Sequence, residues 1–116
     1  MSDALQYFLS PRLPIVGLAA YRIQSLDRVV ATECMTKSFL RASTEEMLTA
    51  MIQNGRDLLP TNNESAIYCW SFDRHKVYVA ARADGACLAF LVENSPEVQG
   101  TRIREALQAF VELSMY

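Results

Sequence analysis

The chain has 116 residues, enough for one domain that buries about two-thirds of its unfolded surface around a single core. Hydrophobic residues make up 51% of the sequence and the formal net charge is -2, so the composition argues against disorder and against strong electrostatic attraction to nucleic acid. No apolar run approaches the ~20 residues that a membrane span needs, and the first residues lack the pattern of a signal peptide. We expect a single cytoplasmic domain over residues 1–116.

The N-terminal part of the sequence predicts a helix followed by a buried strand. Apolar residues recur at helical spacing over residues 2–10, and Pro11 and Pro14 are expected to end this helix. Residues 15–23 are almost all apolar, which is typical of a strand that is buried on both faces.

A hairpin is predicted next. Residues 24–28 are expected to form a polar turn, and residues 29–35 to return as an antiparallel partner strand. This strand carries Thr32 and Glu33, which suit an exposed sheet edge.

The second predicted helix begins at Ser43 and stops before Pro60. Ser43 as N-cap and Glu46 at the third helical position can form a capping box, in which each side chain accepts a hydrogen bond from the other residue's backbone N–H. The acidic Glu45 and Glu46 also suit the positive end of a helix dipole, which explains this carboxylate pair better than acid–base catalysis. Apolar residues then follow at helical spacing: Met47, Leu48, Met51, Ile52, Leu58 and Leu59.

Three further strands are predicted over residues 65–72, 76–82 and 86–93. The Asp-Gly pair at residues 84–85 is a strong hairpin signal, because its turn needs positive φ at both central positions. The three strands therefore form a meander.

The last predicted helix has two possible starts. Ser95-Pro96 provides a cap and a first-position proline, but Gly100 interrupts, so the regular helix is also compatible with a start at Thr101. Apolar residues at helical spacing continue from there to the C-terminus.

The distribution of apolar residues predicts the strand order of one five-stranded antiparallel sheet. The first and fifth strands are the most continuously apolar and belong in the middle, which leaves the second and third at the edges. The third strand places Tyr68, Trp70 and Phe72 on one face, and residues 65–72 contain no charge, proline or glycine. Such an edge is prone to pair with another chain. The alternative is that Tyr68 and Trp70 lie under a helix of their own chain.

Nothing in the sequence spells out catalysis or metal binding. The single histidine, His75, is expected to be a solvated turn residue without a partner to orient it. Cys34, Cys69 and Cys87 are odd in number and lie in apolar segments, so we expect reduced core thiols rather than zinc ligands. The isolated glycines do not form a phosphate-binding loop. We therefore expect no enzyme activity and no cofactor.

The predicted order of helix, two strands, helix, three strands and helix resembles the Roadblock/LC7 family. The segments LPIVGLA at 13–19, KVYV at 76–79, DGACL at 84–88 and QGTRI at 99–103 are similar to the family's strand entry, last hairpin and final helix start. One departure is QSLDR at 24–28, where the family usually has an Asp-Gly type turn. The resemblance implies an α+β sandwich, a fold related to profilin and longin domains.

The resemblance also implies binding rather than chemistry. Roadblock domains dimerise by pairing their third strands, with the second helices side by side, and serve as platforms for Ras-like GTPases, dynein subunits or other scaffold subunits. If the resemblance extends to the dimer, the expected interface residues are Tyr68, Trp70, Phe72, Met47, Met51 and Leu58. Methionines at helical spacing most often belong to the core, although adaptable binding surfaces also use them. A homodimer, a heterodimer-only subunit and a profilin-like or PAS-like small-molecule sensor remain alternatives.

Overall fold

The computed structural model describes residues 8–13, 15–25, 28–34, 41–58, 65–82, 85–96 and 98–112. In chain order the elements are the 3-10 turn η1 (Ser10–Arg12), β1 (Leu18–Ser25), β2 (Arg28–Cys34), α2 (Arg41–Asp57), β3 (Ala66–Ser71), β4 (His75–Ala81), β5 (Ala86–Glu93) and α3 (Gly100–Glu112). This is the α+β class that the sequence predicts.

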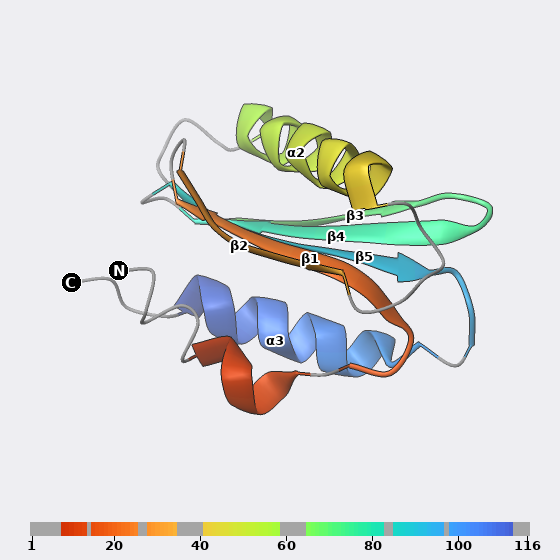
Figure 1. Ribbon diagram of the computed structural model, residues 1–116. Coiled ribbons are helices and arrows are strands. Elements are labelled where there is room, and N and C mark those ends of the chain that lie inside the picture. The colour runs from red at the N-terminus through yellow and green to blue at the C-terminus, as the bar shows by residue number, and fades with distance from the viewer. Residues whose placement is uncertain are drawn as a thin grey trace.

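The strands form one antiparallel sheet in the order β2-β1-β5-β4-β3. The prediction that the first and fifth strands lie in the middle and the second and third at the edges is therefore confirmed. Helix α2 covers one face of the sheet, and α3 together with η1 covers the other (Figure 1). The central strands are apolar on both faces because each face is covered by a helix.

Of the three α-helices predicted from the sequence, the described residues contain two. Phe8 and Leu9 are helical, and the chain then tightens into η1. Pro11 lies within this 3-10 turn, where its missing N–H is tolerated, instead of ending the helix before it. Residues 2–7 of the predicted first helix, and Pro14, lie outside the described residues.

The first hairpin differs from the prediction at both ends. Strand β1 begins at Leu18 instead of Ile15, because Gly17 adopts a positive φ of 80° and the Leu18 N–H donates to the Ile15 carbonyl at 3.0 Å, forming a turn. At the other end Ser25 still pairs with Arg28, so the connection is only residues 26–27 and the expected turn over 24–28 is too long.

Helix α2 starts at Arg41, so the predicted capping box is wrong. Ser43 and Glu46 both lie inside the helix, and neither is available to cap it. The side chain of Thr44 is buried and the Glu45 carbonyl accepts a hydrogen bond from Arg22 Nη1 at 3.4 Å. The first turn of α2 packs on the sheet, and this packing lets the helix begin two residues before Ser43, the residue that the sequence predicts as its N-cap.

Two hydrophobic clusters fill the space between the sheet and its helices. On the α2 face the buried side chains include Leu48, Ile52, Val77, Val79, Ala89 and Leu91. On the α3 face they include Tyr21, Leu88, Phe90, Ile103, Leu107 and Phe110. Helix α3 begins at Gly100, one residue before the alternative start at Thr101, and not at Ser95-Pro96. The buried side chains of α3 follow the apolar spacing that the sequence predicts.

Gly17 and Gly100 allow a matched test of the turn that begins β1. A Cβ at Gly17 would lie 2.8 Å from Val98 Cγ2 and the backbone there has positive φ, whereas a Cβ at Gly100 would meet only Tyr78 Oη at 3.7 Å. We expect Gly17→Ala to lower the free energy of unfolding by about 1–2 kcal/mol or more, and Gly100→Ala to change it little. Urea denaturation of the two variants at equal protein concentration measures this. Equal urea midpoints for both variants would contradict the conclusion that the turn before β1 requires glycine at position 17.

Candidate protein interface at the edge strand

Strand β3 is paired on one side only within the part of the chain that the structure describes. Its partner is β4, in a continuous antiparallel register that runs from Ala66 opposite Ala81 to Ser71 opposite Lys76. The pairing extends one residue further, where the Phe72 N–H donates to the His75 carbonyl at 2.8 Å. No described strand lies along the opposite side of β3, as predicted for this edge.

The aromatic face of β3 lies beside α2 of its own chain. Tyr68 and Trp70 are half-buried, and Trp70 packs against the cluster under α2. A methyl group at Gly55 would lie 3.0 Å from Val79 Cγ1 of β4 and 3.6 Å from Tyr68 Cδ2, so this glycine lets α2 approach β4 closely, next to the edge strand. The Tyr68 and Trp70 rings are 5.8 Å apart. The alternative that Tyr68 and Trp70 lie under a helix of their own chain is therefore correct in part. Both side chains lie beside α2, but both remain partly exposed to solvent.

The other face of β3 is the more exposed one, which sequence reasoning did not single out. Ile67, Cys69 and Ser71 are all exposed, and the exposed fraction of Ile67 is 38%. Because they lie opposite Ala80, Tyr78 and Lys76, these three residues belong to the α3 face of the sheet. The sequence indicates this exposed surface in one way only: the third strand, predicted to be an edge, carries apolar residues on both of its faces. The position of α3 decides that they stay uncovered.

Met47 and Met51 of α2 pack against the same cluster as Trp70 of β3, and Leu58 follows directly after the last residue of the helix. The opposite flank is fixed by two contacts, from Arg22 of β1 to the Glu45 carbonyl and from Arg56 Nη2 to the Gly85 carbonyl at 3.0 Å. At 100° per residue the methionines and Leu58 point away from those contacts. Met47 and Met51 are half-buried and Leu58 is 57% exposed.

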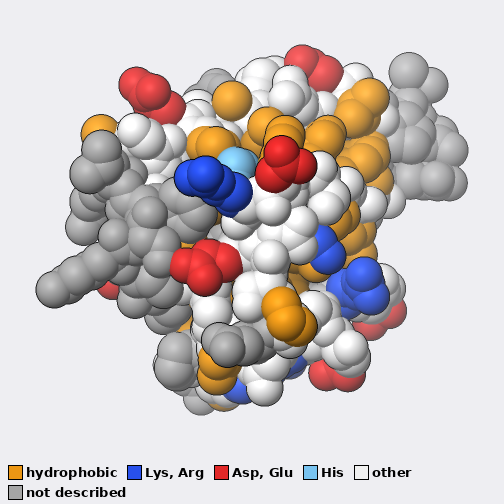
Figure 2. All heavy atoms as spheres, turned by 90° about the vertical axis from the view of Figure 1, so that its right-hand side faces the viewer, with side chains coloured by type: hydrophobic (Ala, Val, Ile, Leu, Met, Phe, Trp, Pro, Cys, Tyr) orange, Lys and Arg blue, Asp and Glu red, His pale blue; other side chains and the backbone are white. Residues whose placement is uncertain are grey.

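Phe72 extends this apolar surface to the β3–β4 hairpin. Its exposed fraction is 40%, and its ring stacks on His75 at 4.8 Å between centroids. His75 is the first residue of β4 and half-buried, so its prediction as a solvated turn residue is wrong. Figure 2 shows hydrophobic side chains gathered beside the pale-blue histidine and to its right.

The β3 edge surface therefore consists of one exposed strand edge and the adjacent flank of α2. It includes all six predicted interface residues, Tyr68, Trp70, Phe72, Met47, Met51 and Leu58, together with Ile67 and Cys69. Met47, Met51 and Trp70 pack against one cluster, which places the helix flank and the strand in direct continuity. The arrangement can form main-chain hydrogen bonds with another strand and bury apolar side chains on both sides of it.

The cysteines divide into one buried and one exposed thiol among those whose side chains are described. Cys87 is fully buried, as predicted for a core thiol, but Cys69 is exposed because its strand lies at the edge. Cys69 is hydrogen-bonded to the hydroxyl group of Tyr78. Burial raises the pKa of Tyr78, the Cys69 side chain raises it further, and Arg104 opposes the shift. Burial likewise raises the pKa of Tyr21, with a contribution from Glu33.

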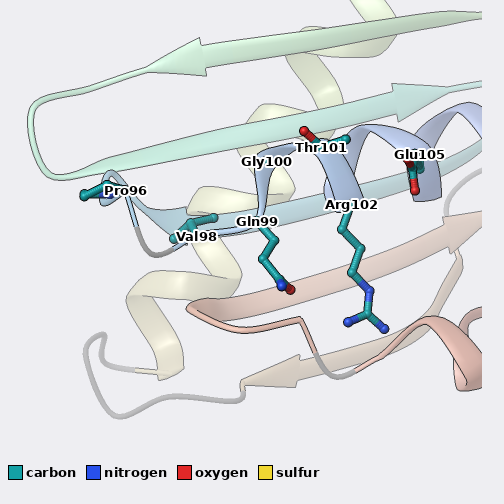
Figure 3. Close-up of a pocket in the computed structure, with 7 residues that line it drawn as sticks. All are labelled: Pro96, Val98, Gln99, Gly100, Thr101, Arg102 and Glu105. Carbon is teal, nitrogen blue, oxygen red and sulfur yellow. The ribbon is translucent and has the colours of Figure 1, made fainter.

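Two surface hollows border α3. One, of about 580 Å³, is lined by Pro96, Val98, Gln99, Gly100, Thr101, Arg102 and Glu105. Gln99 and Arg102 extend in the same direction from the helix start (Figure 3). The other, of about 250 Å³, is lined by Pro11, Arg12, Arg102, Glu105, Ala106 and Ala109. Both are open to solvent. The first contains one positive and one negative side chain, and the second contains two arginines and one glutamate. Neither is a cavity between a helix and the sheet.

The described residues contain no group of three or more side chains arranged to hold a metal ion. No helix in the described part of the chain is both long and apolar enough to cross a membrane.

The raised tyrosine pKa values predict alkaline destabilisation. A raised folded-state pKa means that folding favours the neutral hydroxyl, so this stability is present below about pH 10 and is lost as the pH rises through the folded-state value. Urea midpoints should fall between about pH 9 and pH 11, and Tyr78→Phe should reduce that fall. Tyr21→Phe should also reduce it. A fall as steep in Tyr78→Phe as in the parent protein would contradict the contribution of Tyr78.

Comparison with known proteins gives matches in structure alone. The sequence matches no protein-family model and no curated protein. A solved structure titled MglB with tetrameric arrangement aligns with a TM-score of 0.55 and 15% identity, covering 96% of this chain and 88% of that chain. Myxococcus xanthus MglB aligns with a TM-score of 0.50 and 11% identity, covering 96% and 87%. MglB is a Roadblock/LC7-family protein. The chain therefore has the Roadblock/LC7-type fold that its sequence resembles.

Proposed function

We propose that this chain is a non-catalytic assembly domain that pairs with a second Roadblock-type chain through the β3 edge surface, as a scaffold or regulator for a Ras-like small GTPase. The observation that supports the proposal most is the edge strand itself. It is uncharged over residues 65–72, flanked by apolar side chains from α2, and paired with β4 alone within the described chain.

The energetics favour a protein partner on this surface. An open strand edge presents main-chain N–H and C=O groups in a row, and native proteins commonly protect such edges with charged residues or proline. Strand β3 has neither, and Ile67, Phe72 and Leu58 remain substantially exposed next to it. A partner strand would satisfy the main-chain groups and bury these side chains together. Self-association has a structural parallel in MglB, one of whose structures has a tetrameric arrangement.

The GTPase part of the proposal comes from the Roadblock/LC7 resemblance. A paired sheet with two α2 helices on one face provides a broad platform, and such platforms in this family receive Ras-like GTPases. The chain is proposed to act through binding.

A small-molecule sensor of profilin-like or PAS-like build requires a vacant volume between the sheet and a helix. The positions that would line such a cavity, such as Leu48, Ile52 and Leu91 under α2 and Leu107 under α3, are buried in packed clusters. The described hollows lie on the outer surface of α3 instead. The assembly function is therefore preferred.

The two edges of the sheet provide a matched test of self-association. Ile67 on β3 is 38% exposed and Val29 on β2 is 42% exposed, so Lys substitutions at the two sites add the same charge at comparable exposure. We expect the purified protein to be a dimer by light scattering, Ile67→Lys to weaken dimerisation by about tenfold or more, and Val29→Lys to leave it intact. A parent protein that stays monomeric at high concentration would exclude self-pairing.

The GTPase hypothesis is tested by affinity capture. The immobilised protein should retain a Ras-like GTPase of the same cell in one nucleotide state more than in the other, since a regulator must discriminate between the two states. Ile67→Lys should reduce this retention if the dimer is the platform, and Val29→Lys should not. Recovery of no such GTPase with either GDP or a GTP analogue would count against the proposal.

A further inference from the structure

The outer side of α3 carries a groove that lies apart from the β3 edge surface. The hollows of about 580 Å³ and about 250 Å³ share two lining residues, Arg102 and Glu105, so they are continuous along the helix. Together they extend from Gly100 to Ala109 of α3. This is about 14 Å of helix, which matches about four residues of an extended chain. We call this continuous hollow the α3 groove.

One flank of α3 forms the floor of the groove. Its lining residues Arg102, Glu105, Ala106 and Ala109 recur at helical spacing, which places them on a single stripe of the helix. The two alanines are small, so they leave room beside the helix that larger side chains would fill. Arg104 lies about 200° around the helix from Arg102, and its charge acts on Tyr78 of β4 instead. The two exposed arginines of α3 therefore belong to different flanks.

The segment η1 forms the opposite wall and supplies a second arginine to the groove. Phe8 contacts Phe110 of α3 with ring centroids 6.4 Å apart, which holds the start of η1 against the helix. Arg12 Nη1 donates to the Phe8 carbonyl at 2.8 Å, and Arg12 Cζ lies 4.0 Å from the centroid of the Phe8 ring. These contacts order the half-buried Arg12 side chain before any ligand binds, which lowers the entropy cost of binding.

The charge of the groove is opposite to that of the whole chain. Two arginines and one glutamate line the smaller hollow, which leaves an excess of one positive charge, whereas the formal net charge of the chain is -2. Arg102 has no ion-pair partner among the residues that the structure describes, so its donors are available. Guanidinium groups bind carboxylates through two parallel hydrogen bonds. The α3 groove is therefore complementary to a ligand that carries carboxylates.

The shape of the groove favours a peptide over other anions. Small-molecule sites bury most of the ligand surface, but both hollows are open to solvent. Nucleic acids and anionic membranes are held by larger clusters of basic residues than two arginines. In an extended peptide, every second side chain points the same way at a spacing of about 7 Å. Acidic residues at alternate positions can thus reach both arginines, while Glu105 accepts a hydrogen bond from a main-chain N–H of the peptide.

We propose that the α3 groove binds an extended acidic segment of a partner protein, with Arg12 and Arg102 as the carboxylate-binding residues. The groove lies on the face of the sheet opposite α2 (Figure 1), and it shares no residue with the β3 edge surface. The proposal adds a second interaction surface to the molecule and does not depend on self-association or on a GTPase.

NMR titration of the isotope-labelled protein tests the proposal. The probe is a hexapeptide of alternating glutamate and alanine, and the control is a hexapeptide of alternating lysine and alanine. The glutamate peptide should shift the amide signals of residues 100–109 and of Arg12 with a Kd of about 0.1–1 mM, as expected for a short segment that makes two charged contacts. The lysine peptide should leave these signals in place.

Arg102 and Arg104 provide matched variants, because both are exposed on α3 and Gln substitutions remove the same charge. Arg102→Gln should weaken binding of the glutamate peptide by about tenfold, since a charge-assisted pair is lost. Arg12→Gln should weaken it similarly, and Arg104→Gln should change the affinity by less than about twofold. Ala109→Leu leaves every charge in place but fills the floor of the groove, so it should also weaken binding.

The other outcomes overturn the proposal. These are equal weakening by Arg104→Gln and Arg102→Gln, equal binding of the lysine peptide, and the lack of any shift at about 5 mM glutamate peptide. Acetate or inorganic phosphate that shifts the same signals with the affinity of the peptide would identify a site for small anions only, and would overturn it too. Light scattering decides self-association separately, so the groove and the proposed function can each fail while the other stands.

Discussion

The one-sided pairing of β3 is the constraint on which the functional interpretation of this molecule depends. Main-chain hydrogen bonds fix this strand to β4 from Ala66 to Phe72, and its other side is open within the described residues. Main-chain groups have a strong tendency to be satisfied, and the strand carries no charge to discourage a partner. An uncharged edge of this kind favours pairing with a further strand, which is the basis of the proposed function.

The layers on either side of the sheet determine what a partner would contact. Helix α2 approaches β4 closely at Gly55, next to the edge strand, and leaves Tyr68 and Trp70 half-buried, with Met47 and Met51 on its outer flank. On the opposite face Ile67 and Cys69 of the edge strand stay exposed, although α3 covers the centre of that face. At the edge strand, α2 therefore partly covers one face of the sheet, and the other face is exposed to solvent. In the proposed assembly, this asymmetry would give a partner strand apolar contacts on both faces of the sheet.

Two half-buried arginines hold α2 in position over the sheet. Arg22 reaches the Glu45 carbonyl from β1, and Arg56 reaches the Gly85 carbonyl from α2, so each ties the helix to a fixed point beside the sheet. Burial lowers the pKa of Arg22, and the nearby Glu45 opposes that shift. These contacts orient α2 so that its methionine-bearing flank faces the edge strand.

The sequence by itself determined the strand order and the identity of the edges, because continuous apolar runs require burial on both faces and only central strands offer it. It also determined that the third strand lacks charge and proline. It did not determine the start of α2, where burial of Thr44 outweighed the local capping signal at Ser43, or the turn at Gly17. The tertiary structure alone decided that Ile67 and Cys69 are exposed while Tyr68 and Trp70 lie beside α2. Alternation assigns residues to two faces, but only the positions of the helices decide which face is covered.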